Sequence, residues 1–154
     1  MMNVSRQPRR RLVRILSSEL DDGIRECLSG FVHEVANEGI SVVTLIPSTV
    51  HENDLLEKAA EQRWDLAMLI LNNIMYSSGE RSAPAIIRDA GNLVHKLKQL
   101  FGKPILCFYG WLDDPALINI ATNAGADGVF RLPCSREDLF PALRRCLDQV
   151  PDLS

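Results

Sequence analysis

The sequence predicts an α/β domain in which short strands alternate with amphipathic helices around one parallel sheet. Brief apolar runs rich in β-branched residues recur along the chain, and segments with apolar residues every three or four positions follow them. With 154 residues, 46% hydrophobic and 24% charged, the chain has the composition of one water-soluble domain. A domain of this length buries roughly two-thirds of the surface of its unfolded chain, so we expect a substantial core.

The apolar runs give the expected strands. They cover Leu12–Leu16, Ile40–Ile46, Leu66–Leu71, Ile105–Phe108 and Gly128–Arg131. The second run is continuously apolar and β-branched before Pro47, which predicts a strand buried on both faces.

The helices are predicted from apolar residues that recur on one side of each segment. Their apolar faces comprise Ile24, Cys27, Leu28, Phe31, Val32 and Val35; Leu55, Leu56, Ala59 and Ala60; Ile86, Ile87, Ala90, Leu93, Val94, Leu97 and Leu100; Leu117, Ile120, Ala121 and Ala124; and Leu139, Leu143, Cys146, Leu147 and Val150. We expect Gly39, Gly102 and Gly125 to end helices. Asp113 or Asp114 is the expected cap before Pro115, and Ser135 with Asp138 is close to a capping box.

Repeated strand and helix units imply right-handed crossovers, and therefore helices on both faces of the sheet. We expect a three-layer α/β/α sandwich with a five-stranded parallel sheet of order 2-1-3-4-5, which is flavodoxin-like. In that order a ligand would lie beyond the carboxyl ends of the first and third strands, beside loops 17–23 and 72–82. The predicted domain spans 12–150, after a basic, flexible leader over 1–11 and before a tail over 151–154.

Charge and apolar content exclude several classes of protein. A net charge of −3 argues against a surface devoted to nucleic acid, although Arg6, Arg9, Arg10, Arg11 and Arg14 crowd the start. No run of 18 or more apolar residues is present, so we expect a cytoplasmic protein without a membrane span. The cysteines Cys27, Cys107, Cys134 and Cys146 are far apart and lie within apolar patterns, which predicts buried, reduced thiols.

Two segments resemble a known family. The run Arg14–Glu26 (RILSSELDDGIRE) is similar to the opening of a bacterial response-regulator receiver domain, and Ala124–Pro133 (AGADGVFRLP) is similar to its ending. The resemblance covers roughly 12–150 and implies the flavodoxin-like fold and a role in two-component signalling or a phosphorelay. In that family an acidic pair holds magnesium, an aspartate at the end of the third strand accepts a phosphoryl group, and a hydroxyl residue and a lysine respond to it.

The chemical residues of that family are replaced here. Matching the segments places Glu19 and Leu20 at the acidic pair, with Asp21 and Asp22 nearby. Ile70 or, after a shift of two, Asn72 followed by Asn73 stands where the phosphoryl acceptor belongs. Tyr109 takes the hydroxyl position and Leu132 takes the lysine position. Because an acyl phosphate needs a carboxylate and compensating positive charge, we expect a degenerate receiver pocket without phosphotransfer.

The sequence therefore predicts a phosphorylation-independent, receiver-like module that acts through protein contacts, with a homodimer as one candidate. The resemblance places a partner-binding face at Trp111, Leu112, Arg131 and Arg136. An exposed tryptophan would be an aromatic anchor for such an interface, whereas a tryptophan packed under its own loop would not be. We expect no catalytic residue, no metal and no cofactor, because His33, His51 and His95 are far apart in sequence.

A small-ligand domain is the alternative hypothesis. Ser77, Ser78, Gly79 and Ser82 could present hydroxyl and amide groups to the phosphate of a flavin or nucleotide near a helix start. Acidic residues Glu19, Asp21 and Asp22 would repel such an anion. Cobalamin-binding domains share this fold class, but their histidine ligand has no counterpart in the loop that contains Asp21, Asp22 and Gly23.

Overall fold

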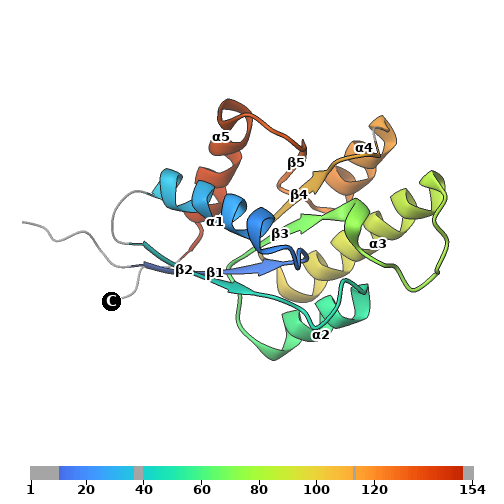
Figure 1. The fold of residues 1–154 in the computed structure, drawn as a ribbon, viewed down its shortest axis with the longest axis horizontal. Helices are drawn as coiled ribbons and strands as arrows, with labels where there is room; N and C mark the ends of the chain where they lie inside the picture. The colour runs from blue at the N-terminus through green and yellow to red at the C-terminus, as the bar shows by residue number, and fades with distance from the viewer. Residues whose placement is uncertain (1–10, 37–39, 113, 151–154) are drawn as a thin grey trace, which may run out of the picture.

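A computed structural model describes residues 11–36, 40–112 and 114–150. Strands and helices alternate along the chain, and the five strands form one parallel sheet in the order β2-β1-β3-β4-β5. The predicted fold class and strand order are therefore confirmed (Figure 1). The elements are β1 (Arg11–Ser17), α1 (Asp22–Ala36), β2 (Ile40–Leu45), α2 (Glu52–Glu61), β3 (Leu66–Ile70), a 3₁₀ turn η1 (Leu71–Asn73), α3 (Ala83–Phe101), β4 (Ile105–Tyr109), α4 (Pro115–Ala124), β5 (Gly128–Arg131) and α5 (Arg136–Leu147).

Two hydrophobic clusters hold the three layers together, one on each face of the sheet. Helices α2, α3 and α4 pack on one face, where Trp64 and Leu93 are buried in what we call the α2–α4 cluster. Helices α1 and α5 pack on the other face, where Val32 and Leu143 are buried in what we call the α1–α5 cluster, whose helical residues come from these two helices (Figure 1). The central strands β3 and β4 are buried along their whole length, because helices cover both of their faces.

Helix ends follow the predicted capping chemistry. Asp114 accepts a hydrogen bond from the backbone of Ala116, and Ser135 accepts one from Asp138. Gly102 and Gly125 end α3 and α4 with positive φ angles, a conformation that costs glycine little. The expected stop at Gly39 and the alternative cap Asp113 lie outside the described residues.

The prediction that the second strand is buried on both faces is wrong. β2 is at the edge of the sheet and pairs with β1, so partly or largely exposed residues alternate along it, and the Val43 side chain is 43% exposed. A run of β-branched residues favours a strand wherever the strand lies, and does not by itself report whether helices cover it.

The predicted burial of all four thiols is also wrong. Cys107 and Cys146 are buried, but Cys27 is exposed and Cys134 is partly exposed. On α1 the buried stripe narrows to Leu28, Val32 and Val35, because Ile24 and Cys27 near the start of the helix are exposed. On α2 the stripe narrows to Leu55 and Ala59, and Ala60 is exposed.

The glycine-rich segment before β5 has a structural role. Asp127 accepts hydrogen bonds from the Ile105 backbone at 2.8 Å and from Lys98 Nζ at 2.9 Å, so it fastens the start of β4 to α3. At Gly128 a β-carbon would meet the Phe130 ring at 2.6 Å, which explains the glycine there. Within the described residues no helix has the length and apolarity needed to cross a bilayer.

Candidate functional site

The predicted crevice lies where β1, β3 and β4 end. Ser17 and Ser18 close β1, and each side chain accepts a backbone hydrogen bond: Ser17 Oγ from Glu19 at 3.1 Å, and Ser18 Oγ from Ile70 at 2.9 Å. The second bond joins the ends of β1 and β3 directly. The loop after β1 is therefore held against η1, the turn that follows β3.

A chain of hydrogen bonds crosses this edge of the sheet. The Gly110 backbone N–H donates to Asn72 Oδ1 at 2.9 Å, Asn72 Nδ2 donates to Asn73 Oδ1 at 3.1 Å, and Asn73 Nδ2 donates to Glu19 Oε2 at 3.1 Å. The other Glu19 oxygen accepts from the Asp21 backbone at 3.0 Å. Only 4% of Asn72 and 8% of Glu19 are exposed, so these bonds form in a largely desolvated site.

This network requires an amide at position 72. The Asn72 side chain accepts from Gly110 with its oxygen and donates to Asn73 with its nitrogen, whereas a carboxylate could only accept. An acyl phosphate forms when a carboxylate oxygen attacks phosphorus, and a carboxamide lacks that nucleophile. The three predicted residues Glu19, Asn72 and Asn73 are therefore brought together, and their polar groups are bonded to each other.

Asp21 and Asp22 point into different surroundings. Asp21 caps α1, since its Oδ1 accepts a hydrogen bond from the Ile24 backbone at 3.0 Å. Asp22 begins α1, and its exposed carboxylate forms an ion pair with the largely covered side chain of Arg25. Neither carboxylate is bonded to Asn72 or Asn73. Among the described residues no group of three or more His, Cys, Asp or Glu side chains could hold a metal ion.

Tyr109 and Leu132 meet through their backbones. The Leu132 N–H donates to the Tyr109 carbonyl at 2.7 Å, which continues the pairing between β4 and β5. Their side chains belong to opposite faces: Tyr109 is buried in the α2–α4 cluster, and Leu132 packs against the α1–α5 cluster. Both positions that respond to phosphorylation in receivers are thus occupied by side chains that contribute to the core.

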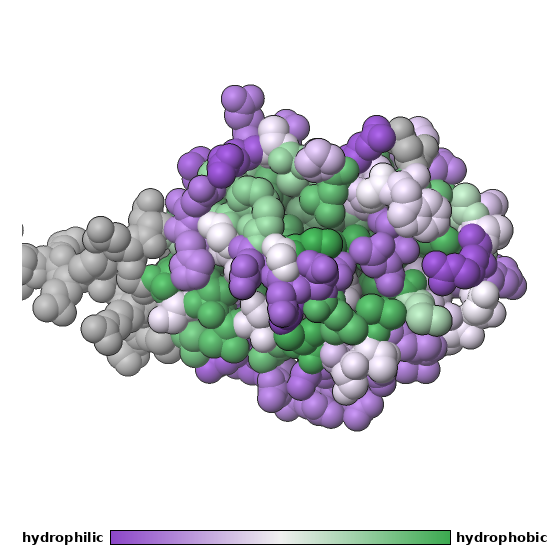
Figure 2. Space-filling model, in the orientation of Figure 1, coloured by the Kyte–Doolittle hydropathy of each residue, from purple (hydrophilic) through white to green (hydrophobic). Residues whose placement is uncertain are grey.

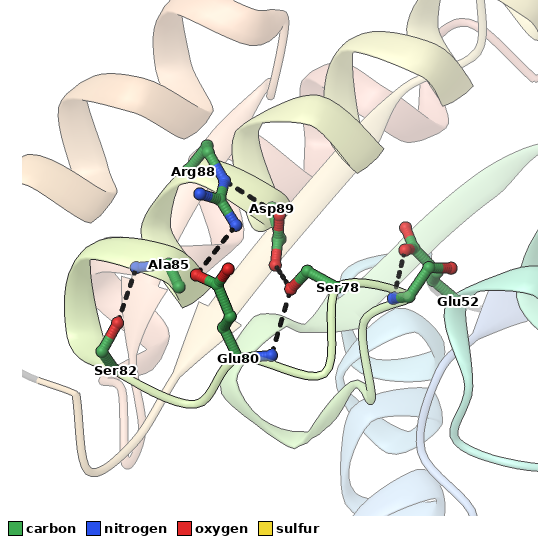
Figure 3. Close-up of polar contacts among 8 residues, drawn as sticks. Glu52, Ser78, Glu80, Ser82, Ala85, Arg88 and Asp89 are labelled. Atoms are coloured by element: carbon green, nitrogen blue, oxygen red, sulfur yellow. Dashed lines mark hydrogen bonds and ion pairs between the residues drawn. The ribbon is translucent and has the colours of Figure 1, made fainter.

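The serine loop between η1 and α3 is held by acidic neighbours. Figure 3 shows Ser78 between Glu80 and Asp89: its Oγ donates to Asp89 at 2.6 Å and accepts from the Glu80 backbone at 3.2 Å. Ser82 caps α3 by accepting from Ala85 at 3.3 Å. The Ser77 backbone donates to Glu52 at 2.6 Å, and Gly79 takes the positive φ that the turn requires. Arg88 pairs with both Glu80 and Asp89, at 3.4 and 3.2 Å, so the groups of this loop are bonded within the protein.

The residues of the predicted interface are distributed over different surroundings. Trp111 is 61% exposed, whereas Leu112 beside it is buried in the α2–α4 cluster. Arg131 is exposed at the end of β5. Arg136 forms a two-pronged ion pair with Glu34 on α1, at 2.9 and 3.2 Å, and lies over the Phe31 ring. That hydrogen bond with Arg136 lowers the pKa of the Glu34 carboxyl.

Two contributors to this edge were not predicted. Ser18 and the Gly110 backbone complete the network, yet the sequence reasoning gave neither a role. The signal was available for Ser18, because the predicted strand order places the residue after the first strand beside the third. Nothing in the sequence indicated that the Gly110 amide would face Asn72.

Solved structures with this fold include receiver domains. A response regulator receiver domain protein from Clostridium thermocellum is 14% identical, with a TM-score of 0.57, and the match covers 90% of this chain and 94% of that one. The NtrX receiver domain from Brucella abortus is 16% identical, with a TM-score of 0.60 and coverage of 89% and 98%. A putative pilus assembly protein (cpaE) from Burkholderia thailandensis E264 is 17% identical, with a TM-score of 0.61 and coverage of 90% and 99%.

No family model and no curated protein matches this sequence. The solved structures show that the chain has the fold of response-regulator receiver domains over about nine-tenths of its length. The predicted resemblance is confirmed as a resemblance of fold. At 14–17% identity these matches show the fold alone.

Proposed function

We propose that this chain is a receiver-like signalling or regulatory module that works without phosphorylation, through contacts with other proteins. The observation that carries the proposal is the Gly110–Asn72–Asn73–Glu19 network. It occupies the strand ends where a receiver would place its phosphoryl acceptor, and it bonds an amide there to its neighbours.

The surroundings of the network support the proposal. A phosphoryl group arriving at this edge would meet the carboxylate of Glu19 and the apolar side chain of Leu132, with Tyr109 packed away in the core. Phosphoryl transfer depends on cations or donors that stabilise negative charge as it develops. The arrangement therefore favours a fixed conformation over a phosphate-driven change between two conformations.

Protein contact has its clearest candidate in Trp111. Large exposed aromatic side chains are enriched at the energetic centres of interfaces, and this one follows β4 on a segment fixed by the buried Leu112. We include a second copy of this chain among the partners to be tested.

The first experiment tests phosphorylation. The purified chain is incubated with acetyl phosphate and Mg²⁺, beside a receiver domain that retains its aspartate, and both are measured by intact mass spectrometry. We expect a phosphoryl adduct on the control receiver and none on this chain. A hydroxylamine-labile adduct on this chain would contradict the proposal.

The second experiment tests Trp111. Cross-linking in the native host is compared for the unchanged chain, Trp111→Ala and Leu100→Ala. The last is a matched control, because Leu100 is a large apolar residue that is 64% exposed on α3, away from the segment that contains Trp111. We expect Trp111→Ala to lose a cross-linked species that Leu100→Ala retains. Native mass spectrometry of the same preparations tests the small-ligand alternative, which a stoichiometric bound molecule would favour.

A further inference from the structure

An apolar groove separates the start of α1 from the loop that joins β5 to α5. The groove has a volume of about 610 Å³, and Ile24, Phe31, Leu132 and Pro133 contribute to its walls. Figure 2 shows hydrophobic residues at the surface between α1 and α5. Two of the four cysteines also line it: Cys27 from α1 and Cys134 from the loop.

The two thiols in the groove differ from the other two cysteines in their accessibility. Cys107 and Cys146 are buried in the two hydrophobic clusters, whereas Cys27 is exposed and Cys134 is partly exposed. Burial raises the pKa of the Cys134 thiol, and the proximity of Cys27 raises it further. The pKa of Arg136 is raised chiefly by its hydrogen bond to Glu34. Cys27 also raises the pKa of Arg136, so the guanidinium lies close enough to the Cys27 sulfur for the two to interact electrostatically.

These positions suit a nucleophilic thiol and a second thiol that resolves it. A thiolate is the reactive form of cysteine, and nearby positive charge together with exposure favours its reaction. Cys27 is exposed, so a small oxidant can reach its sulfur, and it lines the same groove as Cys134. Cys134 is in the segment 132–135, which belongs to no helix or strand, whereas Cys27 is held in α1.

We propose that Cys27 and Cys134 form a reversible disulfide across this groove when the protein meets a hydroperoxide. The Cys27 thiolate attacks the terminal peroxide oxygen, the O–O bond breaks, and the alcohol or water leaves with the proton, so that Cys27 becomes a sulfenic acid. The Cys134 sulfur then attacks the Cys27 sulfur, the S–O bond breaks, and water leaves. Two thiols are oxidised by two electrons, and one peroxide is reduced.

The disulfide would join α1 to the loop that contains Leu132. It makes the groove a site of reversible thiol modification, with hydroperoxides as the class of oxidant. This inference goes beyond the proposed function and does not rest on it, because neither thiol belongs to the Asn72 network.

The test uses the full chain and hydrogen peroxide. The chain is oxidised with a small molar excess, the remaining thiols are alkylated under native conditions, and the peptides are mapped by mass spectrometry. We expect one crosslink between the peptides that contain Cys27 and Cys134, a loss of two hydrogen atoms from the intact mass, and full reversal by dithiothreitol. Cys27→Ser and Cys134→Ser should each lose the crosslink. Protection of Cys107 and Cys146 from alkylation shows that each variant is folded.

Three results would overturn the proposal. One is oxidation of Cys27 to sulfinic or sulfonic acid while Cys134 stays available to the alkylating reagent. Another is a disulfide that links two copies of the chain in place of the internal one. The third is the absence of any reaction at concentrations that oxidise a free cysteine peptide.

Discussion

Replacing Asn72 by aspartate tests whether the amide network occupies the pocket. Asn72→Asp keeps the acceptor for the Gly110 N–H but removes the donor to Asn73 Oδ1. Leaving that oxygen opposite another acceptor in a desolvated site costs about 1–3 kcal/mol. The new carboxylate would also be separated from the Glu19 carboxylate only by the Asn73 side chain. At roughly 7 Å and an effective dielectric of about 20, that repulsion is about 2 kcal/mol.

A charge-assisted bond from Gly110 returns about 1 kcal/mol, so we expect a net loss of about 2–4 kcal/mol in the free energy of unfolding. Urea denaturation at pH 7.5 measures it. The matched control is Asn92→Asp, because Asn92 is exposed on α3 and the same substitution there should change stability by less than about 0.5 kcal/mol.

The deficit should depend on pH with a definite sign. Burial beside Glu19 raises the folded-state pKa of the introduced carboxyl above its unfolded value of about 4. Below the unfolded value the group is neutral in both states, so the charge penalty is absent. The penalty grows as the pH rises to the folded value and is constant above it. Equal stability of Asn72→Asp and Asn92→Asp at pH 7.5 would show that position 72 does not need an amide.

Three further predictions concern the framework around the pocket. Gly91→Ala should destabilise the fold by about 1–2 kcal/mol despite the better helix propensity of alanine, because the alanine β-carbon would lie 2.2 Å from Ile120 Cγ2. Ile120→Ala in the same chain should relieve the loss. A double-mutant cycle by urea denaturation measures the coupling between the two substitutions. Burial raises the pKa of the Cys146 thiol to about 11. Cys146 should therefore resist iodoacetamide at pH 8.5 until the protein unfolds, while the exposed Cys27 reacts. Early modification of Cys146 in the native protein would contradict the packing of α5. Burial raises the pKa of Tyr76 well above its usual value, so the stability that the neutral phenol contributes is complete below about pH 10 and is lost as the pH rises further. Tyr76→Phe should remove this alkaline loss, and at neutral pH it should cost about 1 kcal/mol, because the hydrogen bond from the Tyr76 hydroxyl to the Leu71 carbonyl is lost. Urea denaturation at a series of pH values measures both effects.

The sequence carries most of the fold because strand runs, helix stripes and caps agree with one another. Ser82, Asp114 and Ser135 each cap the helix that follows, and these are local hydrogen bonds that depend on a few neighbouring residues. The strand order followed from the alternation of elements. Local chemistry and topology therefore determine the elements and their order.

Burial at the margins was harder to predict, because it depends on which elements lie at an edge. Val43 has the side chain of a core strand and is exposed because β2 has a partner on one side only among the described strands. Cys27 continues an apolar stripe whose neighbours do not cover it. Both errors arise from three-dimensional context, which periodicity within one element does not contain.

The candidate site was predicted in part for the same reason. The positions Glu19, Asn72 and Asn73 follow from the strand ends, whereas their mutual hydrogen bonds depend on the shape of η1 and on the Gly110 amide. The resemblance to receivers indicated which positions to compare. The hydrogen bonds among Glu19, Asn72, Asn73 and Gly110 became visible only in three dimensions.

Titration with beryllofluoride and Mg²⁺ tests whether the pocket at Asn72 can bind a phosphoryl group, because this phosphoryl mimic activates the DrrB and NtrC4 receiver domains that share the fold. Backbone amide spectra of the isotope-labelled chain report on Glu19, Asn72, Asn73 and Gly110. We predict that these four resonances stay in place throughout the titration. Saturable shifts centred on them would show that the pocket accepts a phosphoryl mimic and that the amide network does not close it.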